Sequence, residues 1–343
     1  MLTGHGRYCL IAVSLAFITM ALSCKPTAQR QVVVYTSLDR DYAEPILKDF
    51  ERQSGIRVLA VYDTEATKTT GLVNRLIAER KHPRADVFWS SEVGRTVILK
   101  RKGILQRFTP RSAVDIPDAF KDRDGFWVGY AVRARVIVYN TKRLRHRDCP
   151  KSIFDLTDEK WRGKVAIANP MFGTTSTHVA ALFCALGEQR AMQFFQRLKA
   201  NKVGVVEGNS IVRDRVATGE YLLGLTDTDD VWVGRDMGQP VALILPDQHE
   251  NGIGTLVIPN TIALIANCPH PEEGKALMEY LLSPDVEQKL ALGPSRQLPV
   301  RAHLKVQRGV APLSRIKAMK VDYDSLADWI DKAVPMVKEL LTP

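Results

Sequence analysis

The apolar positions of the chain fall into short blocks that alternate between two periods. Residues 32–36 read VVVYT, a β-branched run that is typical of a buried strand. Residues 41–53 repeat apolar side chains at helical spacing, and Gly55 is expected to end that helix. Further strands are expected at 56–62 and 86–89, and further helices at 67–80 and 93–102. Strands that alternate with helices in this way predict a mostly parallel sheet with helices on both faces.

The same alternation continues along the rest of the chain and predicts a second α/β unit after residue 140. At 343 residues the chain is too long for a single core of ordinary size. The expected strands lie at 126–132, 135–140, 164–168, 203–206, 221–226, 241–245 and 255–266. The expected helices lie at 175–186, 188–200, 210–218, 271–282 and 325–341. We therefore predict an α/β protein of two domains.

An apolar segment near the N-terminus has the features of a secretory signal. Residues 10–22 are apolar apart from Ser14 and Thr19, and Arg7 is the only charged residue among the first 23. A run of this length is too short to span a bilayer comfortably, and it ends in small residues. We therefore predict a signal peptide over residues 1–23, which places the mature protein outside the cytoplasm.

The segment Ala21-Leu22-Ser23-Cys24 resembles a bacterial lipobox, in which the cysteine is lipidated and becomes the mature N-terminus. Position −3 holds Ala21 where leucine is usual, so ordinary signal cleavage with Cys24 uninvolved is the alternative. We predict lipidation of Cys24 and a lipid-anchored linker at 24–31. Such an anchor would hold the protein near a membrane partner.

Composition and charge narrow the range of partners. Apolar residues make up 45% of the chain and charged residues 25%, which is typical of a soluble globular protein. The formal net charge is +10, and loss of Arg7 with the signal peptide leaves +9. In a cytoplasmic protein this balance would suggest nucleic acid, but export argues against that partner, so we predict none. Three further cysteines, Cys149, Cys184 and Cys268, are separated by long spacings. These spacings are compatible either with one disulfide or with three free thiols.

No segment has the spacing of a common catalytic motif. The chain contains no GxSxG elbow, no HExxH helix and no P-loop. His146-Arg147-Asp148 matches the start of a kinase catalytic loop, but Ile153 stands where that loop needs asparagine. We therefore predict that the protein is not an enzyme, with an exported hydrolase as the remote alternative.

Several motifs together resemble the periplasmic solute-binding proteins of ABC importers, and specifically their ferric-ion-binding branch. They are, in chain order, VVVYTSLD, FERQSGIRV, PRADVFWSSE, RARVIVYNT, NPMFGTTST and EGNSIVRDRVATGEYLLGLTDTDD. Their order and spacing carry the resemblance, which extends from residue 32 to about residue 299. It implies two α/β domains of a type II-like periplasmic-binding-protein fold, with a ligand cleft between them that closes by a hinge motion.

The resemblance also implies where the domains divide and what the protein does. Domain 1 would comprise residues 30–132 and 252–305, and domain 2 would comprise residues 133–251 and 306–343. The protein would be a monomeric receptor that captures a small ligand and delivers it to the permease of an ABC importer and its ATPase. The first choice of ligand is Fe³⁺ bound with phosphate or carbonate, and no permanent cofactor is expected.

A Gly-Thr-Thr-Ser segment at residues 173–176 follows a strand and a turn and opens an expected helix. Free N–H groups and positive potential at a helix N-terminus attract anions, although simple capping would also explain these residues. The family binds its anion at this place. Of Arg133 and Arg135, one is expected to face the cleft and the other to be exposed, and we choose Arg133. The predicted anion and ligand site is Ser37, Arg133, Gly173, Thr174, Thr175, Ser176, Asn209 and Asp227.

Three carboxylates lie within four residues at Asp227, Asp229 and Asp230, in an expected turn after a strand. Like charges this close repel unless a cation or water screens them. In the family a Tyr-Tyr pair that ligates iron occupies the positions that are Asp229 and Asp230 here. A histidine ligand of part of the family falls where this chain has Ser37-Leu38-Asp39.

Carboxylate oxygens nevertheless suit a hard trivalent cation such as Fe³⁺. The acidic ligand that the family has after its third strand maps near Ser91 and Glu92. The predicted metal ligands are therefore Asp39, Glu92, Asp229 and Asp230. An acidic face opposite an anion-binding helix end also suits a small zwitterion, such as an amine that carries a phosphonate, phosphate or carboxylate, and this ligand is the alternative.

Overall fold

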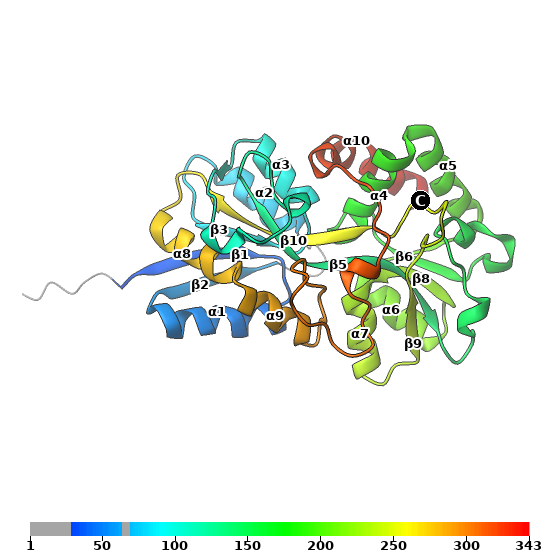
Figure 1. Ribbon diagram of the computed structural model, residues 1–343. Helices are drawn as coiled ribbons and strands as arrows, with labels where there is room; N and C mark the ends of the chain where they lie inside the picture. The colour runs from blue at the N-terminus through cyan, green and yellow to red at the C-terminus, as the bar shows by residue number, and fades with distance from the viewer. Residues whose placement is uncertain (1–28, 64–68, 343) are drawn as a thin grey trace, which may run out of the picture.

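The computed structural model describes residues 29–63 and 69–342. The predicted signal peptide and Cys24 lie outside these residues, as does most of the expected linker. Across the described part of the chain, no helix is both long and apolar enough to cross a membrane. Figure 1 shows two lobes of strands and helices joined at the centre of one sheet.

The first lobe, on the left in Figure 1, contains the start of the described chain and a later return. Its strands are β1 (Gln31–Thr36), β2 (Arg57–Tyr62), β3 (Val87–Ser90), β4 (Leu105–Gln106) and β10 (Val257–Ile265). Its helices are α1 (Arg40–Ser54), α2 (Thr70–Ala78), α3 (Gly94–Arg101), α8 (Pro271–Leu281) and α9 (Pro284–Leu292). Strand β1 pairs in parallel with β2 and β3, whereas β10 returns antiparallel to β3. The parallel pairs fit the predicted β-α-β alternation.

The second lobe repeats this design with residues from the middle of the chain and the C-terminal helix. Its strands are β6 (Val165–Ala168), β7 (Gly204–Val206), β8 (Leu223–Asp227) and β9 (Val241–Ile244). Its helices are α4 (Gly173–Leu186), α5 (Glu188–Ala200), α6 (Asn209–Thr218), α7 (Thr228–Asp236) and α10 (Tyr323–Leu341). Strand β6 lies in parallel between β7 and β8. Short 3₁₀ turns lie at Arg111–Ala113, Asp118–Phe120, His146–Asp148, Phe154–Thr157, Glu159–Trp161 and Leu313–Arg315.

A single long strand, β5 (Val128–Asn140), connects the lobes. Its first half pairs with β10, and its second half pairs with β8 and β9. The prediction of two separate strands at 126–132 and 135–140 is therefore wrong. Arg133 and Arg135, at the boundary of those ranges, break the apolar pattern, but they lie on a strand whose 13 residues are all buried. The resulting sheet has the order β2-β1-β3-β10-β5-β8-β6-β7, with β4 paired to β10 and β9 paired to β5.

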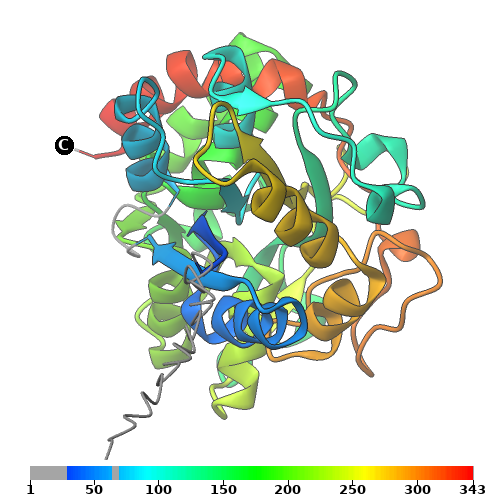
Figure 2. The same ribbon diagram turned by 90° about the vertical axis from the view of Figure 1, so that its left-hand side faces the viewer.

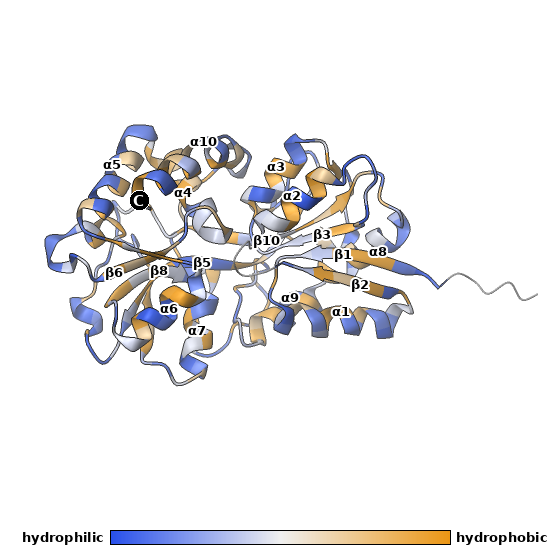
Figure 3. Cartoon of the chain, turned by 180° about the vertical axis from the view of Figure 1, so that it is seen from behind, coloured by the Kyte–Doolittle hydropathy of each residue, from blue (hydrophilic) through white to orange (hydrophobic). Residues whose placement is uncertain are grey.

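Helices cover the sheet on both faces, which explains why its central strands are apolar rather than alternating. All nine residues of β10 are buried. Figure 3 shows the apolar sides of the helices turned toward the strands, and Figure 2 places α1 and α10 on opposite sides of the sheet. Helix α10 packs on α4 and α5 and also contacts α3, so it spans both lobes.

The acid-rich segment after β8 is a helix start rather than the predicted turn. Asp227 occupies the N-cap position of α7, and Asp229 and Asp230 lie in its first turn. Acidic side chains are favourable there because the free N–H groups give a helix N-terminus a partial positive charge. The predicted α/β architecture is otherwise confirmed.

Candidate functional site

A small cavity lies between the lobes at the middle of the sheet. The first lobe contributes Asp39 and Ser91, the linking strand contributes Arg133, and the second lobe contributes Gly173, Thr174, Asn209, Asp227, Asp229 and Asp230. The cavity volume is ≈ 30 Å³, which is enough for an ion or a water molecule. The structure thus brings together most of the predicted site residues from segments far apart in the sequence.

Three carboxylates meet at one wall of this cavity. Oxygen atoms of Asp227, Asp229 and Asp230 lie within 4.8 Å of one another. Asp227 and Asp229 are buried and Asp230 is half-buried. With Asp39 the cavity holds four carboxylates against the guanidinium groups of Arg133 and, beside it, Arg135. The excess of two negative charges favours a cation.

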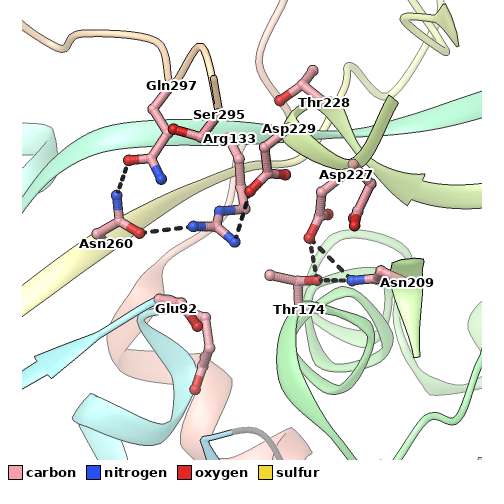
Figure 4. A network of polar contacts seen from close by, with 12 residues as sticks. Glu92, Arg133, Thr174, Asn209, Asp227, Thr228, Asp229, Asn260, Ser295 and Gln297 are labelled. Carbon is pink, nitrogen blue, oxygen red and sulfur yellow. Dashed lines mark hydrogen bonds and ion pairs between the residues drawn. The ribbon is translucent and has the colours of Figure 1, made fainter. Parts of the chain in front are cut away.

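Asp227 is held in place by a network inside the second lobe. Its Oδ1 accepts a hydrogen bond from Arg135 Nη1 at 2.8 Å, and its Oδ2 accepts one from Thr174 Oγ1 at 2.6 Å. Asn209 Nδ2 donates to the same Oδ2 at 3.1 Å (Figure 4). Asp227 therefore ties β8 to β5, α4 and α6, and it orients the residues around the cavity.

The two arginines of β5 are both buried. Arg135 is only 1% exposed and pairs with Asp227, so the prediction that one of the two arginines is exposed is wrong. Arg135 Nη1 also donates to Thr174 Oγ1 at 3.2 Å and to Asn209 Oδ1 at 3.0 Å, at the starts of α4 and α6. Arg133 Nη1 lies 3.2 Å from Asp229 Oδ2.

The surroundings of Arg133 fix its position. Its Nη2 donates to Asn260 Oδ1 at 3.0 Å, and Asn260 donates in turn to Gln297 Oε1 at 2.7 Å (Figure 4). Burial lowers the pKa of Arg133, but the charge of Asp229 and its neighbours outweighs that effect and holds the pKa above its ordinary value. Arg133 is thus a permanent cation at the edge of the carboxylate group.

The predicted anion-binding segment opens helix α4 at the cavity. Gly173 and Thr174 line the cavity, and the first N–H groups of a helix have no partner inside it. The hydroxyl of Thr175 donates to Asn209 Oδ1 at 3.3 Å. Ser176 instead faces the first lobe, where its hydroxyl accepts from Arg95 Nη2 at 3.4 Å. The helix end is therefore placed to bind an anion beside the carboxylates.

The predicted residues of the first lobe divide into two groups. Asp39, at the N-cap of α1, lines the cavity and is exposed. Ser37 is buried, and its Oγ accepts a hydrogen bond at 2.8 Å from the N–H of Ser91, which lines the cavity. Glu92 does not line the cavity. It is 0% exposed, and its carboxylate accepts from the hydroxyl of Thr177 at 2.5 Å (its position is shown in Figure 4). The structure thus places Ser91, rather than Glu92, at the cavity wall.

Some residues around the cavity escaped the sequence analysis. Asn260 and Gln297 lie in segments with no distinctive pattern, and Ser91 was passed over for its neighbour Glu92 within the motif PRADVFWSSE. Tyr42 had a usable signal, because it lies one helical turn after Asp39 and so shares its face of α1. Burial, and then the charges of Asp229, Asp39 and Asp230, raise the pKa of Tyr42 well above its ordinary value, so its phenol stays neutral.

Comparisons with known proteins agree with this architecture. Residues 83–325 match the family of bacterial extracellular solute-binding proteins. Iron uptake protein A1 of Synechocystis sp. is 24% identical over 326 residues, which are 92% of this chain and 88% of that protein. The major ferric iron-binding protein of Neisseria meningitidis serogroup B is 25% identical over 331 residues, which are 94% of each chain.

Solved structures give the same result at the level of the fold. Iron-bound HitA from Pseudomonas aeruginosa superposes with a TM-score of 0.81 at 22% identity, covering 91% of this chain and 99% of that one. AfuA from Actinobacillus pleuropneumoniae with exogenous fructose-6-phosphate bound gives 0.78 at 19% identity, covering 92% and 99%. The Trichodesmium protein in complex with iron and citrate gives 0.76 at 21% identity, covering 90% and 99%. These likenesses confirm the predicted two-domain periplasmic-binding-protein fold.

Proposed function

Because this chain belongs to the family of bacterial extracellular solute-binding proteins, we propose that it captures a ferric ion together with a synergistic anion and delivers both to an importer. The single observation that carries this proposal is the group formed by Asp227, Asp229 and Asp230. Their oxygens converge within 4.8 Å at the end of helix α4 that can bind an anion. Relatives named for iron uptake and ferric-iron binding support the same ligand.

The chemistry of the donors suits this ion. Hard cations such as Fe³⁺ prefer carboxylate and other oxygen ligands. Asp229 and Asp230 would ligate the ion from the second lobe and Asp39 from the first, while Asp227 orients the group. Phosphate or carbonate would complete the coordination from the α4 N-terminus. The positive charge of the ion would also offset the excess negative charge of the cavity.

An organic phosphate is the second candidate ligand. Arg135, Thr174 and Asn209 form a polar face beside the α4 N-terminus, and a structure of similar fold holds fructose-6-phosphate. A cavity of ≈ 30 Å³ favours the smaller ligand, because a sugar phosphate would need the lobes to move apart.

The place and partners of the protein follow from the proposed role. It would work outside the cytoplasmic membrane as a monomer, anchored by a lipid on Cys24, and would dock on an ABC permease whose ATPase drives import. It would not catalyse a reaction. We propose that the lobes divide as residues 30–132 with 252–305 and residues 133–251 with 306–343.

A thermal-shift panel on the purified protein tests the ligand. Ferric citrate, citrate, inorganic phosphate, fructose-6-phosphate and 2-aminoethylphosphonate would be added separately, because a ligand that binds only the folded state raises its melting temperature. We expect a rise with ferric citrate that exceeds the rise with citrate or phosphate alone. A rise only with an organic phosphate or phosphonate would refute the ferric ligand.

The double variant Asp229→Asn/Asp230→Asn then tests the site itself. It should abolish the ferric shift, because both carboxylates are lost while the side-chain size is kept. Asp236→Asn is the matched control on the same helix, since Asp236 forms only a surface ion pair with Arg296. Retained ferric binding by the double variant would remove these residues from the site.

A further inference from the structure

Two side chains at the start of helix α3 reach from the first lobe to helix α4 of the second. The carboxylate of Glu92 accepts a hydrogen bond from Thr177 Oγ1 at 2.5 Å. The guanidinium of Arg95 donates to the carbonyl of Met171 at 3.1 Å and to Ser176 Oγ at 3.4 Å. The first two turns of α4 and the turn before it are thus held from across the cleft.

The side of this contact that belongs to the first lobe is firmly built. The Glu92 carboxylate also accepts from the N–H of Arg95 at 3.0 and 3.2 Å, which gives a partner to a free N–H in the first turn of α3. The carbonyl of Glu92 accepts from Ser90 Oγ at 2.7 Å and from Thr261 Oγ1 at 3.4 Å. These bonds lie within one lobe and would survive if the lobes moved apart. The bonds to Thr177, Ser176 and Met171 would not.

The lobes also approach each other closely at this point. A Cβ atom on Gly94 would lie 2.5 Å from Ile330 Cδ1 of α10 and 3.0 Å from Thr177 Oγ1. A larger residue here would require the side chains of Ile330 and Thr177 to shift or the helices to move apart. Glu92 is 0% exposed, and this burial raises the pKa of its carboxyl.

The contact is continuous with the cavity. Ser91 lines the cavity and directly precedes Glu92, and Gly173 and Thr174 line it one turn before Thr177. We propose that Glu92 and Arg95 form an interlobe latch, in which their hydrogen bonds to α4 hold the closed cleft and position the α4 N-terminus on the bound ligand. This inference rests on the proposed capture of a ligand in the cleft. Glu92 and Arg95 are positioning residues that touch no ligand themselves.

The latch explains why a carboxylate is buried at a place where it lines no cavity. A buried carboxylate without partners is unstable, and Glu92 has its full set of donors only while α4 is in contact. Closing of the lobes therefore completes the hydrogen bonds of the Glu92 carboxylate. Ligand release requires this carboxylate to exchange the bond from α4 for hydrogen bonds with water. Loss of the latch should speed release much more than it slows capture.

The test uses Thr177→Val, Glu92→Gln and the double variant, with Thr218→Val as control. Thr177→Val removes only the bond across the lobes, whereas Thr218 bonds within its own helix and is exposed. Dissociation of iron from protein loaded with ferric citrate is followed after addition of a strong chelator. We expect release to be about tenfold faster in each single variant, no faster in the double variant, and unchanged in the control.

Other outcomes distinguish a failure of the latch proposal from a failure of the proposed iron capture. Wild-type release rates in Thr177→Val, or effects that multiply in the double variant, would overturn the latch and leave iron capture intact. If the wild-type protein binds no iron, the proposed function fails and small-angle scattering of the unliganded protein decides the latch. Glu92→Gln and Gly94→Ala should then enlarge the radius of gyration, and an unchanged radius in both would overturn the latch.

Discussion

Substitution of Asp227 by asparagine should damage the stability of the fold far more than its position in an acidic cluster suggests. Asp227 is 1% exposed, and its two oxygens accept hydrogen bonds from Arg135, Thr174 and Asn209. The substitution removes the charge and leaves Arg135, also 1% exposed, as a buried cation. Breaking a buried ion pair on one side costs about 3–5 kcal/mol. The asparagine carbonyl keeps one acceptor, so we expect about 3 kcal/mol.

Urea unfolding followed by circular dichroism measures this loss as a lower midpoint at unchanged slope. Asp236→Asn serves as the control, because Asp236 pairs with Arg296 at the surface with its side chain 46% exposed. Exposed pairs of this kind contribute less than about 1 kcal/mol. If the free energy of unfolding of Asp227→Asn lies within about 1 kcal/mol of the wild-type value, the Asp227 carboxylate does not stabilise the fold as the structure indicates. Asp227 would then count as a direct ligand.

Two further predictions concern charge and thiols. Arg133→Gln should tighten ferric binding by about tenfold, because it removes the cation paired with Asp229, and should weaken binding of fructose-6-phosphate. Isothermal titration with both ligands checks the two signs, and a loss of ferric affinity would contradict the carboxylate site. Burial raises the pKa of the thiols of Cys149, Cys184 and Cys268 to about 11. A disulfide reagent at pH 8 should therefore label these thiols in the folded protein roughly 100-fold more slowly than it labels thiols of ordinary pKa. Rapid labelling before unfolding would show that these cysteines are accessible in the folded state.

Local patterns in the sequence were sufficient to predict the class of the fold. β-branched runs alternating with helical periods predict parallel strands and covering helices, because each pattern depends on neighbours in the same segment. The Gly-Thr-Thr-Ser helix start and the carboxylates near residue 230 were found for the same reason. The resemblance to solute-binding proteins rested on motifs of this local kind and is confirmed by the family match over residues 83–325.

The tertiary structure decided which of those residues act together. Asp227 and Arg135 are separated by 92 positions, and Glu92 and Thr177 by 85, so no local pattern links them. The pairing of β5 with β8 sets Arg135 opposite Asp227 within the second lobe, whereas Glu92 meets Thr177 because the joined lobes bring α3 against α4. For this reason the sequence could predict Glu92 as a ligand and Arg135 as an exposed residue, whereas the structure buries both. The sequence determined which chemical groups are present. The tertiary distances between distant segments determined their roles, because hydrogen bonds and ion pairs depend on atomic separation and exclusion of water.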